Sequence, residues 1–254
     1  MTETSSKRPT RPRFEGKRVL ITGATSGIGR AGAERLTAEG ADLVLTGTNP
    51  RRLDDLRARF PTAVVVANDA SSPTTGDELL DALGSGGIDG LWLNAGVATT
   101  APIAEVDVES FDALMAVNVR GPFLQLAAIS ARLNTSASVL VTASTSAYEA
   151  APTTAVYAAG KAALIAAAQT WAFELADRGI RVNTLVPGPI DTAFRDFMHP
   201  DTRAGFEKAV LGSVPLGRVG TPLEAAAVAV FLLSEDASYV TAAQYAVDGG
   251  LTHR

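Results

Sequence analysis

The chain of 254 residues contains no cysteine and only two histidines. The absence of cysteine excludes disulfide bonds, thiolate catalysis and metal sites built on cysteine. His199 and His253 are too few for a histidine-rich metal site, and a Ser-His-Asp hydrolase would depend on one of these two residues. We therefore expect no metal site and a chemistry other than that of such a hydrolase.

Excess positive charge and long apolar runs are also missing. The net charge of −5 and the pI near 5.1 argue against a broad phosphate-binding surface, so we expect no nucleic-acid partner. No apolar stretch reaches about 18 uncharged residues, and the N-terminus lacks the apolar core of a signal peptide. We expect a soluble, cytoplasmic protein without membrane contact. Residues 1–13 are locally basic and contain two prolines, which indicates a flexible leader; a nucleic-acid or membrane arm is the alternative.

Short runs of Val, Leu and Ile alternate with longer amphipathic or alanine-rich stretches, a pattern typical of parallel strands joined by crossover helices. The pattern predicts strands at 18–23, 42–47, 62–68, 88–94, 137–144, 180–186 and 243–248. It predicts helices at 27–39, 50–59, 75–84, 107–133, 154–177 and 222–234, with a further helix near 201–212. Because no interior stretch resembles a linker, we expect residues 14–254 to form one α/β domain. Its fold would be a doubly wound Rossmann fold of about seven parallel strands, flanked by helices on both faces.

Ligands of such sheets bind outside the carboxyl ends of the strands. The residues that end the predicted strands are Gly23, Gly47, Asp69, Asn94, Ser144 and Pro187. Because the loops at one sheet edge converge, we expect these residues to form a single site.

A glycine-rich segment, Thr22 to Gly29, joins the first predicted strand to the first predicted helix and reads Thr-Gly-Ala-Thr-Ser-Gly-Ile-Gly. The missing side chains let the backbone approach a pyrophosphate, and the helix N-terminus favours its negative charge. A glycine-rich turn without a ligand is the structural alternative. The strand before and the helix after the segment favour a dinucleotide site.

Tyr157 and Lys161 lie four residues apart, on one face of a predicted helix. Free tyrosine ionises at about pH 10, so a general acid/base role requires a positive neighbour that lowers the pKa, and Lys161 can supply that charge. Ser144, thirteen residues upstream of Tyr157, can hydrogen-bond a substrate carbonyl, although Thr145 and Ser146 could compete for this role.

These motifs, in this order, resemble the short-chain dehydrogenase/reductase family from about Gly16 to Gly250. The resemblance implies a nicotinamide-dependent oxidoreductase that transfers hydride to or from a carbonyl or secondary alcohol, with Tyr157 as general acid/base. The catalytic residues that it implies are Asn118, Ser144, Tyr157 and Lys161. Asn118 would hold a water in the proton relay; an asparagine that satisfies a helix kink is the alternative. Asn94-Ala95-Gly96 is similar to the family's Asn-Asn-Ala-Gly, with Leu93 in place of the first asparagine, which puts a sheet-supporting polar contact in doubt.

The resemblance also implies the cofactor contacts, with Asp69 and Ala70 at the adenine and residues 187–192 at the nicotinamide carboxamide. The expected cofactor-binding residues are Gly23, Thr25, Ser26, Gly27, Ile28, Gly29, Thr48, Asn49, Asp69, Ala70, Asn94, Ala95, Gly96, Tyr157, Lys161, Pro187, Gly188, Ile190 and Thr192. No acid ends the second predicted strand, where it would bind the adenosine ribose and repel a 2′-phosphate. Arg51 and Arg52 could meet that phosphate, although exposed helix arginines are the commoner explanation. We favour NADP over NAD.

Residues 190–215 are predicted to form a substrate lid. The apolar side chains in this stretch favour a hydrophobic ketone or secondary alcohol, although Arg195, His199 and Arg203 allow an anionic group. The helix at 154–177 has alanines on all sides, as in a helix covered by both a sheet and another subunit. The family resemblance implies a homodimer or homotetramer. An NADP-binding sensor or scaffold without turnover is the main alternative function, and an epimerase or dehydratase is a second.

Overall fold

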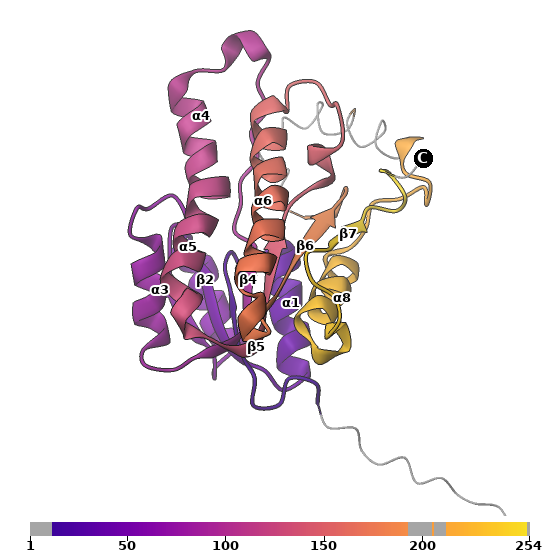
Figure 1. Cartoon of the computed structure of the whole chain (residues 1–254). Coiled ribbons are helices and arrows are strands. Elements are labelled where there is room, and N and C mark those ends of the chain that lie inside the picture. The colour runs from indigo at the N-terminus through magenta and orange to yellow at the C-terminus, as the bar shows by residue number, and fades with distance from the viewer. Residues whose placement is uncertain (1–11, 193–204, 206–211, 253–254) are drawn as a thin grey trace, which may run out of the picture.

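The computed structural model describes residues 12–192, 205 and 212–252 (Figure 1). The strands are β1 (Arg18–Ile21), β2 (Asp42–Gly47), β3 (Val64–Ala67), β4 (Ile88–Leu93), β5 (Leu133–Thr142), β6 (Arg181–Pro187) and β7 (Gln244–Val247). They form one sheet in the order β3-β2-β1-β4-β5-β6-β7, and every neighbouring pair is parallel. The predicted seven-stranded, doubly wound α/β fold is confirmed.

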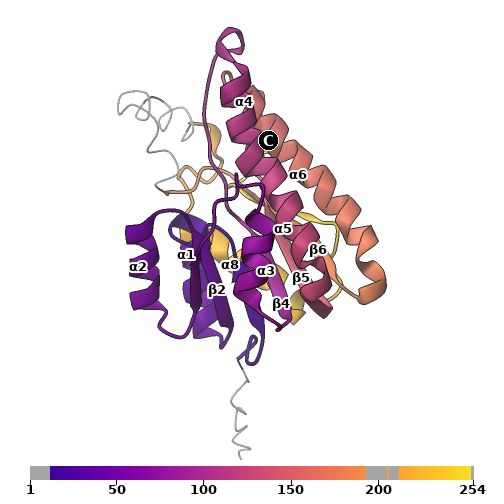
Figure 2. The same cartoon turned by 90° about the vertical axis from the view of Figure 1, so that its left-hand side faces the viewer.

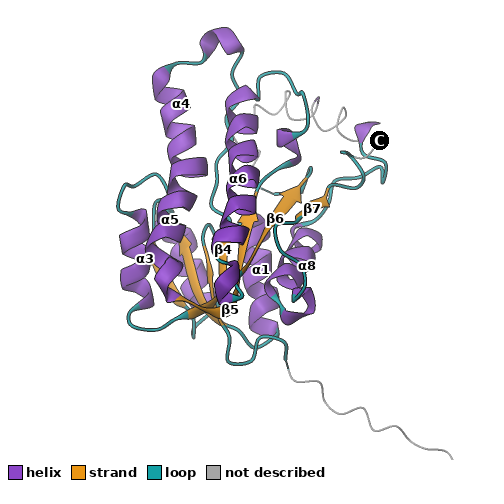
Figure 3. Cartoon of the chain, viewed as in Figure 1, coloured by secondary structure: helices purple, strands orange, loops and turns teal. Residues whose placement is uncertain are grey.

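Helices cover both faces of the sheet (Figures 2 and 3). They are α1 (Gly27–Ala38), α2 (Pro50–Arg59), α3 (Thr75–Leu83), α4 (Val108–Met115), α5 (Gly121–Ile129), α6 (Ala155–Glu174) and α8 (Pro222–Leu233). Trp92 and Leu140 belong to the core under α1, α2 and α8, whereas Leu93 and Val141 belong to the core under α3, α5 and α6. Successive side chains of a strand therefore pack into the cores on opposite faces of the sheet, because side chains alternate between the two faces along a strand.

Helix boundaries follow local chemistry. Thr221 and Glu224 form a capping box at the start of α8, with Pro222 in the first turn. The side chain of Asn49 caps α2 by accepting a hydrogen bond from the backbone of Arg52. These contacts satisfy amides that a helix leaves unpaired at its start.

Two predicted elements differ from the structure. The helix predicted at 107–133 consists of α4, a π-helical turn (Ala116–Arg120), α5 and a 3-10 turn (Ser130–Arg132). Pro122 lacks the amide hydrogen that would bond to the carbonyl of Asn118, so regular α-helical pairing cannot continue there. The strand predicted at 137–144 begins earlier, at Leu133, and includes a register shift against β4 and a positive φ of 64° at Ser136.

The helical run Val108–Arg132 is long and apolar enough to cross a membrane by length and composition alone, since an 18-residue window within it has a mean hydropathy of 1.2. Within the fold, 44% of that window is buried. Leu126 and Ile129 belong to the core on this face of the sheet. A core helix passes the same test, so this run is weak support for a membrane span.

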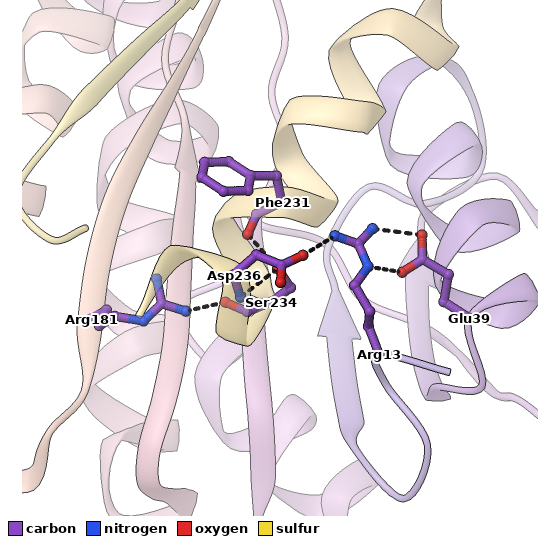
Figure 4. Close-up of polar contacts among 6 residues, drawn as sticks. All are labelled: Arg13, Glu39, Arg181, Phe231, Ser234 and Asp236. Atoms are coloured by element: carbon purple, nitrogen blue, oxygen red, sulfur yellow. Dashed lines mark hydrogen bonds and ion pairs between the residues drawn. The ribbon is translucent and has the colours of Figure 1, made fainter. Parts of the chain in front are cut away.

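Polar contacts fasten the amino edge of the sheet (Figure 4). The Arg13 guanidinium donates to Glu39 after α1 and to Asp236 after α8, with Nε–Oε2 and Nη1–Oδ2 distances of 2.7 Å. Arg181 donates to the carbonyl of Ser234 at 2.9 Å. These contacts lie opposite the edge that carries the candidate site.

Candidate active site

The residues that were predicted to end the strands lie together at the carboxyl edge of the sheet. Gly47 and Pro187 are the last residues of β2 and β6. The others, Gly23, Asp69, Asn94 and Ser144, follow their strands by one or two residues. The adjacent parallel strands therefore bring six segments that are distant in sequence to one edge.

The glycine loop is held against the end of β4. Thr22 Oγ1 accepts hydrogen bonds from the backbone amides of Asn94 (3.0 Å) and Ala95 (3.1 Å). Gly23 has a φ of 65°, and a Cβ there would lie 2.8 Å from Ala95 Cα, so only glycine allows this approach. The loop is thereby fixed against the end of β4 by contacts within the chain.

The start of α1 is suited to an anion. Ser26 precedes α1 in an extended conformation, its side chain makes no capping hydrogen bond, and no acidic residue occupies the first turn. Thr192, after β6, lies over the loop, with its Cγ2 3.1 Å from where a Cβ on Gly27 would stand. A helix start without a side-chain cap and a glycine-rich loop before it fit the pyrophosphate of a dinucleotide.

The remaining predicted contacts border this loop. Thr48 and Asn49 are exposed after β2. Asp69 is exposed after β3, where its Oδ1 accepts hydrogen bonds from the backbone and side chain of Ser71 at 2.8 Å, and Ala70 beside it is buried. Asp69 thus shapes the turn at which the adenine contact is expected.

Tyr157 and Lys161 lie on one face of α6 and are both buried, with exposed fractions of 9% and 3%. Lys161 Nζ lies 5.8 Å from the centre of the Tyr157 ring and donates to the carbonyl of Thr142 at 3.0 Å. A Cβ on Gly96 would lie 3.2 Å from the same Nζ. The predicted helical pairing therefore places a buried ammonium and a buried phenol beside the loop after β4.

Burial dominates the protonation of this pair in the absence of a cofactor. It raises the pKa of Tyr157 to about 12, while a hydrogen bond with Ser144 acts in the lowering direction. Burial also lowers the pKa of Lys161 to about 8. The expectation that Lys161 brings the pKa of Tyr157 below its usual value is therefore wrong for this structure, because desolvation of the phenolate outweighs the lowering effect of the Ser144 hydrogen bond.

Ser144 lies two residues after β5, in the half-buried turn that leads to the helix of Tyr157. Its Oγ accepts a hydrogen bond from the backbone amide of Ser146 and donates to Ser146 Oγ, both at 3.2 Å. Thr145, one of the two alternatives, is buried. Among these hydroxyls, that of Ser144 bonds to the Tyr157 phenol.

Asn118 is completely buried in the π-helical turn between α4 and α5. Its Oδ1 accepts from the backbone amide of Val97 at 2.9 Å, and its Nδ2 donates to the carbonyl of Val97 at 2.8 Å. Asn118 Oδ1 would also lie 3.1 Å from a Cβ on Gly96. The side chain thus fixes the segment after Gly96, beside Lys161.

Sequence reasoning missed Trp92 and Thr142, whose side chains support Asn94. The alternation of side chains places Trp92 and Asn94 on one face of their strand, but it does not reveal which residue of the neighbouring strand lies beside them. The hydroxyl of Tyr148, on the turn after Ser144, donates to the Gln244 side chain on β7. Most of the predicted lid and the predicted helix near 201–212 lie outside the described residues. In the part of the chain that the structure describes, no group of three or more His, Asp or Glu side chains could hold a metal ion.

Known proteins share both the sequence and the fold. A family model described as enoyl-(acyl carrier protein) reductase matches residues 23–252. Glucose 1-dehydrogenase of Gluconobacter oxydans is 34% identical over 259 residues, which cover 96% of this chain and 95% of that relative. A short-chain dehydrogenase/reductase of the glucose/ribitol dehydrogenase type from Brucella melitensis superposes with a TM-score of 0.89 at 32% identity, over 95% of this chain and 98% of that one.

A further solved structure contains a cofactor. A blue fluorescent protein from a metagenomic library, in complex with NADPH, has a TM-score of 0.86 at 30% identity and covers 94% of this chain and 99% of its own. The extent of these matches settles the family. The chain belongs to the short-chain dehydrogenase/reductase family and is an NAD(P)-dependent oxidoreductase with a small-molecule substrate.

Proposed function

We propose that Tyr157 is the general acid/base of a reaction that interconverts a ketone and a secondary alcohol. The single observation that carries this proposal is the buried Tyr157–Lys161 pair beside the glycine loop. The nicotinamide, when bound, supplies or accepts the hydride. With a pKa of about 12, the phenol is neutral at rest, so it can donate its proton to a carbonyl oxygen that is being reduced.

Three further residues support the proton transfer in this proposal. Ser144 hydrogen-bonds the phenol and orients the substrate carbonyl against it. Lys161, whose pKa near 8 leaves it mostly charged at neutral pH, stabilises the phenolate that forms. Asn118 fixes the segment at Val97 and holds the water through which the proton is replaced.

We also propose a preference for NADP. A Cβ on Gly47, at the end of β2, would lie 2.3 Å from Thr25 Cγ2, so an acid that binds the ribose hydroxyls cannot be accommodated there without displacing Thr25. Arg51 and Arg52 are exposed at the start of α2, and neither side chain has a partner within the described residues. Their guanidinium groups are available to a 2′-phosphate.

We further propose that the enzyme is a cytoplasmic homodimer or homotetramer. Exposed aromatic side chains project from neighbouring helices: Phe111 on α4, Phe123 on α5 and Phe173 on α6, with exposed fractions of 42%, 43% and 81%. Trp171 on α6 is buried beneath this surface and packs edge-on against Phe123, with 4.8 Å between ring centres. Light scattering at micromolar concentration tests the assembly, and a monomeric mass would contradict it.

The function is tested by following nicotinamide absorbance with NADPH or NADH and a panel of carbonyl compounds. The panel includes sugars, apolar ketones, and 3-oxoacyl and enoyl thioesters, so that reduction of C=O is separated from reduction of C=C. Consumption with a ketone or aldehyde, and a kcat/KM ratio of NADPH to NADH above one, support both proposals. Tight cofactor binding without turnover across the panel would favour the alternative of an NADP-binding sensor.

A further inference from the structure

A continuous chain of hydrogen bonds runs behind the glycine loop. Trp92 Nε1 donates to Thr142 Oγ1 (2.9 Å), and Thr142 Oγ1 donates to Asn94 Oδ1 (3.1 Å). Asn94 Nδ2 then donates to the carbonyls of Thr22 and Gly23, both at 3.2 Å. The chain thus begins in the core and ends on the backbone that is expected to hold the cofactor.

The strand register brings these side chains together. Trp92 on β4 pairs with Leu140 on β5. Asn94 and Thr142 each follow one of these two residues by two positions, so all four side chains point to the same face of the sheet. Trp92 is fully buried and Thr142 is 9% exposed, so water does not readily replace the bond between them.

The direction of every bond in this chain is fixed. An indole N–H can only donate, and a main-chain carbonyl can only accept. The Thr142 hydroxyl must therefore accept from Trp92 and donate to Asn94, and the Asn94 carboxamide must turn its nitrogen to the glycine loop. A hydroxyl at position 142 meets both demands, whereas an apolar side chain meets neither.

Thr142 is also bonded to the reaction centre. Its main-chain carbonyl accepts the hydrogen bond from Lys161 Nζ at 3.0 Å. Leu93, which replaces the first asparagine of the family motif, is buried in the apolar core on the other face of the sheet. The polar link across β4 and β5 is made instead by Trp92 and Thr142.

We propose that Thr142 is a positioning residue for the dinucleotide. Its hydroxyl sets the orientation of Asn94, and Asn94 holds the start of the glycine loop in the shape that binds the cofactor pyrophosphate. This inference rests on the proposed function, because it assumes that NADPH or NADH binds at this loop. Substitution of the Thr142 side chain should therefore change the affinity for the cofactor. It leaves in place the main-chain carbonyl of Thr142 that accepts the hydrogen bond from Lys161.

The test compares Thr142→Val with Thr142→Ser by titrating NADPH and NADH fluorescence. Valine leaves the buried Trp92 Nε1 without an acceptor and removes the donor that orients the half-buried Asn94 Oδ1. We expect the cofactor Kd to rise about tenfold while kcat at saturating cofactor changes less than about threefold. Serine restores the hydroxyl, and the Kd should return to within about twofold of the native value.

Ser138→Ala is the matched control for a purely structural effect. Ser138 lies on the same strand, is also buried, with an exposed fraction of 1%, and donates to the carbonyl of Leu232 at 3.0 Å, away from the glycine loop. This variant should lower the melting temperature and leave the cofactor Kd unchanged. A Thr142→Val protein that loses stability but binds the cofactor as tightly as the native protein would refute the positioning role.

A second measurement does not depend on the valine variant. The chain has two tryptophans, so in Trp171→Phe the remaining indole N–H resonance belongs to Trp92. Saturation with NADPH should shift this resonance, and an unmoved resonance would overturn the inference. If the native protein binds neither NADPH nor NADH, the proposed function itself fails and the inference fails with it. If the native protein binds and the valine variant binds equally, only the inference fails.

Discussion

Replacing Lys161 with methionine should make the cofactor-free protein's stability less dependent on pH. Burial lowers the pKa of Lys161 from 10.5 to about 8 in the folded protein. Below pH 8 the lysine is charged in both states, and the folded state bears the cost of a buried ammonium. Between about pH 8 and 10.5 the unfolded chain binds more protons than the folded one, so the free energy of unfolding rises with pH.

The size of this effect follows from the two pKa values. For a shift from 10.5 to about 8, linkage gives a gain of about 2.5 kcal/mol in native stability between pH 6 and pH 10. Lys161→Met lacks this contribution, although it also leaves the Thr142 carbonyl without its donor. That second loss does not depend on pH. The difference in slope therefore reports the buried charge more cleanly than stability at any single pH.

The assay is urea unfolding of native protein and Lys161→Met at a fixed protein concentration from pH 6 to pH 10. The raised pKa of Tyr157, about 12 in the folded protein, makes its contribution to the free energy of unfolding fall as the pH rises past 10. Both proteins share this contribution. Lys17→Met, which removes a half-buried ammonium paired with Glu235 at the amino edge, controls for the loss of one charge. A native-minus-variant difference that stays constant across this range would refute the reasoning.

Ser144→Ala should lower kcat by about a hundredfold or more, as for loss of a donor to the reacting oxygen. It should also raise the pH at which carbonyl reduction declines, because the bond that lowers the Tyr157 pKa is gone. The pH–rate profiles of the two proteins test both effects. Asn118→Ala removes both bonds to the Val97 backbone and should cost about 2 kcal/mol of stability by thermal unfolding; an unchanged melting temperature would contradict the anchoring role. Gly47→Asp should lower the free energy of unfolding by about 1–3 kcal/mol, because the new side chain collides with Thr25. Adding Thr25→Ser should restore stability and raise the ratio of kcat/KM with NADH to kcat/KM with NADPH. No change in that ratio would contradict the proposed basis of cofactor choice.

The sequence predicts the sheet well because buried parallel strands appear as uninterrupted apolar runs. The start of β5 escapes this signal, since Asn134 to Ser136 are polar and exposed although they belong to the strand. The π-helical turn at Asn118 is likewise invisible to a hydrophobic pattern, and Pro122 is the only local sign of it.

The site could be predicted in part. The spacing of Tyr157 and Lys161 correctly placed both side chains on one helical face, and the strand-end rule gathered the loops at one edge. The charge of Lys161 is visible in the sequence, but the desolvation that raises the Tyr157 pKa is a property of the folded core. The bond between Trp92 and Thr142 depends on the register of β4 against β5, which the pattern of either strand alone does not contain.

The proposal that Tyr157 transfers the proton is tested most directly by Tyr157→Phe, with Tyr148→Phe as the matched control. Tyr148 carries the same phenol on the turn after Ser144, but its hydroxyl is bonded to Gln244 on β7. The measurement is kcat with the best substrate of the panel, together with the cofactor Kd of each protein. We predict that Tyr157→Phe loses about 10²- to 10⁴-fold in kcat while still binding the cofactor, and that Tyr148→Phe remains active. Turnover by Tyr157→Phe at a rate comparable to that of the native enzyme would contradict the proposed mechanism.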